Sequence, residues 1–135
     1  MEFGNYQDAL EDVNRAIKLS PEYVDLYIVR GNIKNSMQDF NGAIADYNYA
    51  INLDPNNVEA YIVRGHAERH LKDFDNALKD YNRALQLDPN DSDAYAGRAD
   101  LKNWLKDPQA ALKDASRALE LESTNAEAYR VRSVA

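Results

Sequence analysis

The chain contains no cysteine, has fewer basic than acidic side chains and carries no long apolar run. Without cysteine it can form neither a disulfide framework nor a thiolate metal site, which suits a reducing compartment. The 16 Lys and Arg residues stand against 23 Asp and Glu residues, so the net charge of −7 repels phosphate backbones and anionic lipids. These absences predict that neither nucleic acid nor a membrane is a partner.

The remaining composition is that of an ordinary folded domain. The 135 residues include 44% hydrophobic and 29% charged side chains, which suits one domain and disfavours both disorder and a membrane span. The opening residues MEFGNYQDALEDV lack the basic start and the apolar stretch of a signal peptide. We therefore expect a single intracellular domain, located in the cytoplasm.

An internal repeat organises the whole sequence. The pentapeptide YIVRG stands at 27–31 and recurs 34 positions later at 61–65. The same period divides the chain into three full units between two fragments, which are 1–23, 24–57, 58–91, 92–125 and 126–135. The first fragment matches the second half of a unit, and the last fragment matches the start of one. A fixed period of this length is typical of stacked repeat architectures.

Each unit reads as two helices. Its apolar residues recur at intervals of three and four, as in Ala43, Tyr47 and Ala50, which is the pattern of an amphipathic helix. One break in each unit precedes an Asp that can cap the next helix, as at Asp39, and the other is an Asp-Pro pair in the first two units. The pattern predicts helices of roughly 13 to 15 residues. Two per unit and one per fragment give eight helices.

Several columns of the repeat hold one kind of residue from unit to unit. These columns are Tyr27, Tyr61, Tyr95 and Tyr129; Gly31 and Gly65; Ala9, Ala43, Ala77 and Ala111; Ala16, Ala50, Ala84 and Ala118; Tyr6, Phe40 and Phe74; and Pro21, Pro55 and Pro89. Together with the period they resemble the tetratricopeptide repeat (TPR) family over the whole chain. The resemblance implies an all-α fold, a right-handed α-solenoid of antiparallel helix pairs, in a single domain over 1–135. The third unit departs from the pattern, with Ala99, Pro108 and Ser123 in place of glycine, aromatic and proline.

Two charged columns are equally regular. They are Arg30, Arg64, Arg98 and Arg132, and Asp12, Asp46, Asp80 and Asp114. A partly buried arginine needs a carboxylate partner, so an Arg–Asp ladder is expected in preference to a basic ligand-binding stripe. Pairing within a unit, as Arg30 with Asp46, leaves Asp12 and Arg132 alone. Pairing with the preceding unit, as Arg30 with Asp12, leaves no charge alone and is favoured, and an arginine that bridges both stays open.

The resemblance also implies a function, because TPR proteins are adaptors and scaffolds. Their first helices line a concave groove that receives a peptide or a partner's helix. The matching positions are Ile28, Asn32, Asn35, Ile62, His66, Arg69, His70, Asp100, Asn103 and Trp104, with Asp25, Ser36, Glu59, Glu127 and Arg130 beside them. Ile28 and Ile62 are expected to be apolar contacts exposed in the groove. Trp104 is either a contact residue or a surface residue half-buried against a neighbouring helix.

One subfamily of TPR domains holds the C-terminal carboxylate of chaperones with a clamp of lysine, asparagine and arginine. In this chain the positions that match the lysines and the arginine carry Ile28, Asp93 and Gly97. Asn32 alone matches the clamp. A chaperone tail is therefore disfavoured as the partner.

An enzyme is also disfavoured. His66 and His70 are four residues apart, a spacing that can chelate zinc, but no third ligand is evident and Glu68 points away from them. The sequence shows no phosphate-binding glycine loop and no set of residues for nucleophilic catalysis. We predict no cofactor and no metal, and we interpret the two histidines as a polar patch of the groove.

A structural role is the alternative to an adaptor. The chain opens on a second helix with apolar Leu10, Val13 and Ile17, and it closes on a first helix at 126–135. Repeats bury their faces only against neighbours, so each end complements the other end of a second molecule. This predicts a self-assembling segment that forms a head-to-tail homo-oligomer.

Overall fold

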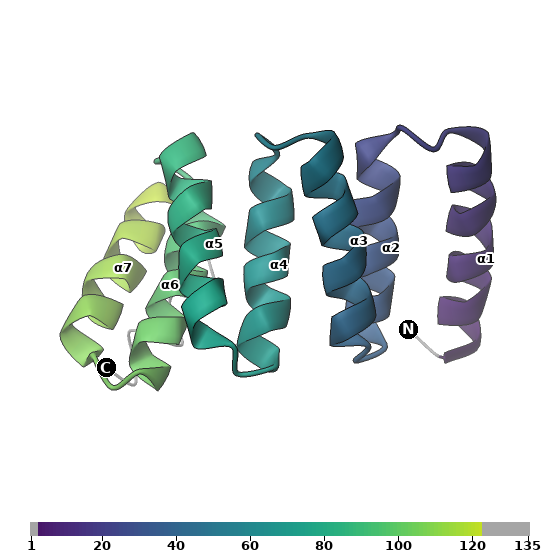
Figure 1. The fold of residues 1–135 in the computed structure, drawn as a ribbon. Helices are drawn as coiled ribbons and strands as arrows, with labels where there is room; N and C mark the ends of the chain where they lie inside the picture. The colour runs from purple at the N-terminus through teal and green to yellow at the C-terminus, as the bar shows by residue number, and fades with distance from the viewer. Residues whose placement is uncertain (1–2, 123–135) are drawn as a thin grey trace.

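The computed structural model describes residues 3–122, and seven α-helices span this part of the chain (Figure 1). In order they are α1 (Phe3–Leu19), α2 (Val24–Ser36), α3 (Phe40–Leu53), α4 (Val58–His70), α5 (Phe74–Leu87), α6 (Ser92–Trp104) and α7 (Pro108–Leu121). No strand occurs within residues 3–122, and the predicted all-α fold of stacked helix pairs is confirmed. The eighth helix, predicted at 126–135, lies outside the described residues, as do Glu127, Arg130 and Arg132.

The starts of the second helices follow from their capping residues. Asp39 accepts a hydrogen bond from the backbone N–H of Gly42 at 3.0 Å, and Asp107 accepts one from that of Ala110 at 3.3 Å. Both caps are as the sequence predicts. Asp73 stands at the same position before α5, but its carboxylate accepts from a side chain of that helix instead of the backbone.

The first helices end at a backbone feature that the residue types at those positions do not predict. Gln38, Lys72 and Lys106 adopt positive φ angles of 66°, 63° and 62°. This left-handed conformation ends many helices, usually at glycine. Here two lysines and a glutamine take it, and each turns the chain into the second helix of its pair.

The helices pack as antiparallel pairs, α2 with α3, α4 with α5 and α6 with α7. The first helix of one pair also contacts the first helix of the next, α2 with α4 and α4 with α6. These three helices therefore share one side of the stack, which we call the first-helix face.

A tyrosine ring lies directly on a glycine in the first two full pairs. A Cβ atom on Gly65 would stand 2.9 Å from Cε1 of Tyr81, which is closer than packed atoms tolerate. Tyr47 covers Gly31 in the same way. Both rings are fully buried, so the glycines allow the two helices of a pair to approach each other around a large side chain.

The third pair shows the converse. Ala115 replaces the tyrosine, Ala99 replaces the glycine, and both alanines are fully buried. The smaller side chain on α7 leaves room for the extra methyl on α6. Tyr81 also reaches α6, where a Cβ atom on Gly97 would lie 2.6 Å from its ring, so one tyrosine joins two consecutive pairs.

The arginine of each pair contacts the aspartate of the same pair. The closest contacts are Arg30–Asp46 at 2.7 Å, Arg64–Asp80 at 2.6 Å and Arg98–Asp114 at 2.8 Å. The favoured pairing with the preceding unit, in which Arg30 meets Asp12, Arg64 meets Asp46 and Arg98 meets Asp80, is therefore wrong. Asp12 is exposed and pairs with no arginine among residues 3–122. The proposed pair of Asp114 with Arg132 extends outside the described residues.

Helix geometry explains the correction. Residues two apart on an α-helix point to nearly opposite sides. On α3, Asp46 faces back to α2, whereas Asn48 faces forward to α4 and accepts from Arg64 at 2.8 Å. An asparagine therefore holds the place in the preceding unit that the sequence-based interpretation assigned to an aspartate.

The same link recurs along the stack, so Arg30, Arg64 and Arg98 each join two consecutive units. Arg30 donates to Asn14 and Arg98 donates to Asn82, each at 2.9 Å. The guanidinium groups also lie over tyrosine rings of their own helices, at 5.6, 5.6 and 5.5 Å from the ring centroids of Tyr27, Tyr61 and Tyr95. Partly buried arginines are thus satisfied by a carboxylate, an amide and a ring.

Candidate functional site

Both isoleucines predicted for the groove are buried. Ile28 is 3% exposed and Ile62 is 6% exposed, so the expectation that they offer apolar contacts in the groove is wrong. Ile28 packs with Tyr27 and Ala50 in the core. One residue along a helix turns the side chain by about 100°. Val29, the neighbour that sequence reasoning missed, is accordingly the exposed apolar residue, at 45%.

The polar groove positions in the middle of the first helices are tied to the buried tyrosines. Asn32 Oδ1 accepts from the hydroxyl of Tyr47 at 2.6 Å. His66 Nδ1 shares a hydrogen bond of 2.7 Å with the hydroxyl of Tyr81. Burial, together with the nearby Arg69 and His70, lowers the pKa of His66 to about 3, so this imidazole is neutral at physiological pH.

Arg69 and Asp100 are brought together by the stacking of α4 on α6. Arg69 Nη1 lies 3.1 Å from Asp100 Oδ2, and it also donates to the carbonyl of Gly97 at 3.3 Å. Both charged side chains are largely buried. They stand in different columns of the repeat, so the period alone gives no signal of this pair. It joins the second unit to the third across the first-helix face.

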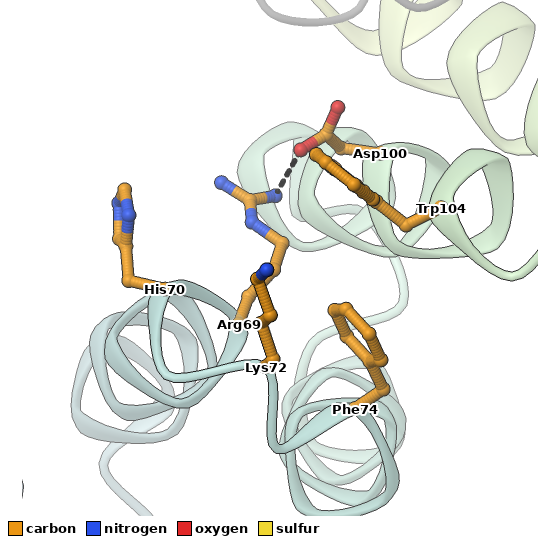
Figure 2. A pocket seen from close by; sticks show the side chains of 6 residues that line it. All are labelled: Arg69, His70, Lys72, Phe74, Asp100 and Trp104. Atoms are coloured by element: carbon orange, nitrogen blue, oxygen red, sulfur yellow. Dashed lines mark ion pairs between the residues drawn. The ribbon is translucent and has the colours of Figure 1, made fainter.

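A pocket opens beside this ion pair (Figure 2). Its cavity of about 310 Å³ is lined by Arg69, His70, Lys72, Phe74, Asp100 and Trp104. Trp104 is 61% exposed, and its ring lies nearly parallel to that of Phe74 at a centroid separation of 6.4 Å. Figure 2 shows Arg69 and Lys72 between His70 on one side and the two aromatic rings on the other. Four of the predicted site residues therefore meet here, and sequence reasoning missed Lys72 and Phe74.

The corresponding position one unit earlier holds a closely stacked pair of rings. His70 lies flat on Phe40, with ring centroids 4.8 Å apart and an angle of 5° between the planes. His66 hydrogen-bonds to Tyr81 and His70 stacks on Phe40, so the two histidines contact different residues. Within residues 3–122, no three His, Asp or Glu side chains are arranged to hold a metal ion.

A smaller pocket lies at the α1 side of the first-helix face. Its cavity of about 240 Å³ is lined by Tyr6, Val29, Asn32, Ile33 and Ser36. Asn35 and Asn103, both predicted for the groove, line neither pocket. Asn35 is half-buried, and its Oδ1 has no hydrogen-bond partner among the described residues. The face thus offers two openings with apolar walls and polar rims, a construction suited to side chains of a partner.

None of the helices between residues 3 and 122 combines the length and the apolar character needed to span a bilayer.

Two family models match the chain. One is described as "Tetratricopeptide repeat" and covers residues 58–91, and the other is described as "TPR repeat" and covers residues 31–68. A search of curated proteins finds no match.

Solved structures with the same fold cover most of the chain. The Arabidopsis OM64 TPR domain is 27% identical with a TM-score of 0.80, over 84% of this chain and 93% of that one. The first TPR of Spaghetti (RPAP3), bound to the HSP90 peptide SRMEEVD, is 30% identical with a TM-score of 0.77, over 82% and 88%. MamA, at 19% identity, a TM-score of 0.83 and coverage of 99% and 82%, shares the fold. The period, the stacked pairs and these similarities lead to one assignment: the chain belongs to the tetratricopeptide repeat family.

Proposed function

We propose that this TPR domain is an adaptor or scaffold that binds a peptide or a partner's helix along the first-helix face. The observation that carries the proposal is the exposure of Trp104 and Val29 beside two open pockets of that face. Large exposed aromatic groups of this kind dominate many interfaces because they bury much area at little entropic cost. A TPR relative of 30% identity is bound to a peptide, which supports an interaction role. The proposal includes neither catalysis nor a cofactor.

The proposed partner is not the C-terminal tail of a chaperone. Of the positions that match the cationic clamp, Ile28 is buried in the core, Gly97 lies under the ring of Tyr81, and Asp93 adds an exposed carboxylate. These residues offer no cation to a terminal carboxylate. A partner segment is instead held by the side-chain pockets. We further propose a cytoplasmic location, which the cysteine-free composition suits.

Substitution of Trp104 tests the proposal. Peptides are selected from a display library on the immobilised full chain, and the affinity of the enriched peptides is measured by calorimetry. Trp104→Ala should weaken them about thirtyfold, the loss expected when a central aromatic anchor worth about 2 kcal/mol is truncated. Leu112→Ala is the matched control, because Leu112 is also exposed but lies on α7 away from both pockets.

Equal affinity of the selected peptides for Trp104→Ala, Leu112→Ala and the unchanged chain would contradict binding at this face. Circular dichroism of each variant confirms that the fold is kept. The head-to-tail association predicted from the two ends stays a prediction, because residues 126–135 lie outside the described part of the chain. A molar mass that is constant over a hundredfold range of concentration would contradict it.

A further inference from the structure

The pocket beside Trp104 differs from its counterparts along the stack. At the preceding position Gln38 replaces Lys72, and the His70 ring stacks on Phe40 at 4.8 Å, closer than the 6.4 Å between Phe74 and Trp104. At the following position a lysine is present, but Pro108 replaces the aromatic. Among residues 3–122, an open pair of rings next to a lysine therefore occurs once.

The size of the pocket suits one side chain. Its volume of about 310 Å³ is at the low end of small-molecule sites, which span about 300–1,000 Å³. Phe74 and Trp104 supply an apolar wall, and Figure 2 shows their rings on the same side of the opening. A large apolar side chain of a partner would bury this wall, where Trp104 is exposed to solvent.

Among the six residues that line the pocket, the charges are not balanced. Arg69 and Asp100 neutralise each other at 3.1 Å, and both are largely buried. Asp73, the next residue along the chain after Lys72, does not line the pocket, and its carboxylate accepts from Asn76 at 2.7 Å on the side of α5. Lys72 is exposed and forms no ion pair within residues 3–122. One free cation thus stands at the rim, on a chain whose net charge is −7.

We infer that the pocket binds a large apolar side chain of a partner segment whose neighbouring residue is an aspartate or glutamate, with that carboxylate paired to Lys72. The inference rests on the proposed function and specifies the chemistry of its ligand. A side-chain carboxylate is the occupant because a single free cation is present, whereas a chain terminus is usually held by several convergent donors. A basic neighbour would face Lys72 and find no free carboxylate among the residues that line the pocket.

Four short peptides test the inference directly on the full chain. They are acetyl-Gly-Phe-Asp-Gly-amide, the same peptide with Asn or with Lys in place of Asp, and acetyl-Gly-Phe with a free carboxylate. Trp104 is the only tryptophan of the chain, so its fluorescence and its indole N–H resonance report binding at the pocket. The Asp peptide should bind about threefold more tightly than the Asn peptide, as an exposed ion pair provides. It should also bind more tightly than the Lys peptide and the peptide with a free terminus.

Lys72→Glu should reverse the order, so that the Lys peptide binds more tightly than the Asp peptide. Lys106→Glu is a closely matched control, because Lys106 has the same left-handed backbone, is exposed and does not line the pocket. Lys106→Glu should leave the preference for Asp unchanged. Equal affinities of the Asp and Lys peptides, or a preference that survives Lys72→Glu, would overturn the inference, and tighter binding of the free terminus would overturn the choice of a side-chain carboxylate.

The outcomes also separate this inference from the proposed function. If the library peptides lose affinity with Trp104→Ala but show no preference for an acidic neighbour, the face binds partners and the assigned chemistry is wrong. If none of the four peptides perturbs the Trp104 resonance up to millimolar concentration, the pocket does not bind this class of side chain. The library selection then decides independently whether the rest of the face binds a partner.

Discussion

The helix pairs α2–α3 and α4–α5 have the same residue types at most equivalent positions, but the surroundings of their equivalent buried aspartates, Asp46 and Asp80, differ. In the first, Asp46 accepts from Arg30 and also lies 3.1 Å from Lys34 Nζ. In the second, the residue at the position of Lys34 is Glu68, which is 8% exposed and contacts Asp80. One aspartate therefore has two cations, whereas the other shares its arginine with a second acid.

The difference shows that the Arg–Asp ladder can be regular along the stack although one unit contains an additional buried acid beside its ion pair. Burial, and then the hydrogen bond to Asp80 and its negative charge, raises the pKa of Glu68 to about 9, although Arg64 acts in the opposite direction. Glu68 is consequently protonated near neutral pH and can donate to the carboxylate of Asp80. Its Oε1 has no hydrogen-bond partner among residues 3–122. The second unit thus carries an acid that its neighbours replace by lysine, Lys34 and Lys102.

The largest expected effect is loss of the aspartate in the first pair. Asp46→Ala leaves Arg30 and Lys34 together without a carboxylate, and we expect a loss of about 3 kcal/mol in the free energy of unfolding. Asp80→Ala should lose about half as much, because Glu68 can ionise and take the place of Asp80 beside Arg64. Urea denaturation at pH 7 measures both.

Asp12→Ala is the control for this series, because Asp12 belongs to the same column but is exposed. It should change the free energy of unfolding by less than about 0.5 kcal/mol. Equal losses for Asp46→Ala and Asp80→Ala would show that Glu68 does not compensate. A negligible loss for both would show that the ladder contributes little to stability.

The next largest effect concerns the packing between the two helices of α4–α5, compared with the packing between the two helices of α6–α7. Gly65→Ala places a methyl 2.9 Å from Tyr81, whose ring is fully buried, so the helices must separate. Overpacking of this kind destabilises by about 1–3 kcal/mol. In α6–α7 the reverse substitution, Ala99→Gly, should lose about 1 kcal/mol, from helix propensity and a small cavity. Thermal unfolding of both variants measures the contrast.

The double variant Gly65→Ala with Tyr81→Ala reproduces the residues of the third pair in the second. Truncation of Tyr81 leaves a cavity, but it removes the clash with the new methyl. We therefore expect the double variant to be less destabilised than the sum of the two single variants. Strict additivity would mean that the methyl and the ring do not compete for the same space.

The fold was largely predictable because its signals are local and periodic. The repeat of 34 residues placed every helix between residues 24 and 122, and the resemblance of its columns to the TPR family indicated the stacked pairs. The caps Asp39 and Asp107 were also evident. The positive φ angles at Lys72 and Lys106 were not, because lysine carries no preference for that conformation.

The site was less predictable because a period assigns residues to columns without fixing how far each helix is rotated against its neighbours. On α2 the prediction placed Ile28 in the groove, but Ile28 is buried and its neighbour Val29 is the exposed residue. On α3 the prediction chose Asp46 as the contact to the next unit, but Asn48, two residues further on, makes that contact, and Asp46 binds Arg30 of its own unit. The pocket itself joins the end of α6 to the start of α5, and the spacing of residues along one helix contains no information on that contact.

The smallest expected effect concerns pH. Between pH 4.5, the ordinary pKa of a glutamate, and about 9, the folded chain retains a proton on Glu68 that the unfolded chain has lost. The contribution of Glu68 to stability is therefore fully present below pH 4.5 and declines as the pH rises through this window, with a slope of at most about 1.4 kcal/mol per pH unit. Other carboxylates change stability over the same range, so a difference between variants is needed.

Glu68→Gln supplies that difference, because its amide can donate to Asp80 at any pH as the protonated acid does. Relative to the unchanged chain, the variant should gain stability from pH 5.5 to pH 7.5, by about 1 kcal/mol after allowance for relaxation around the partly hydrated pair. Glu59→Gln on the same helix, where Glu59 is exposed, should show a constant difference. Urea denaturation at the two pH values measures, for each variant, the difference in free energy of unfolding from the unchanged chain. If Glu68→Gln does not gain stability relative to the unchanged chain between these two pH values, Glu68 is already ionised in the folded chain and Arg64 balances both acids.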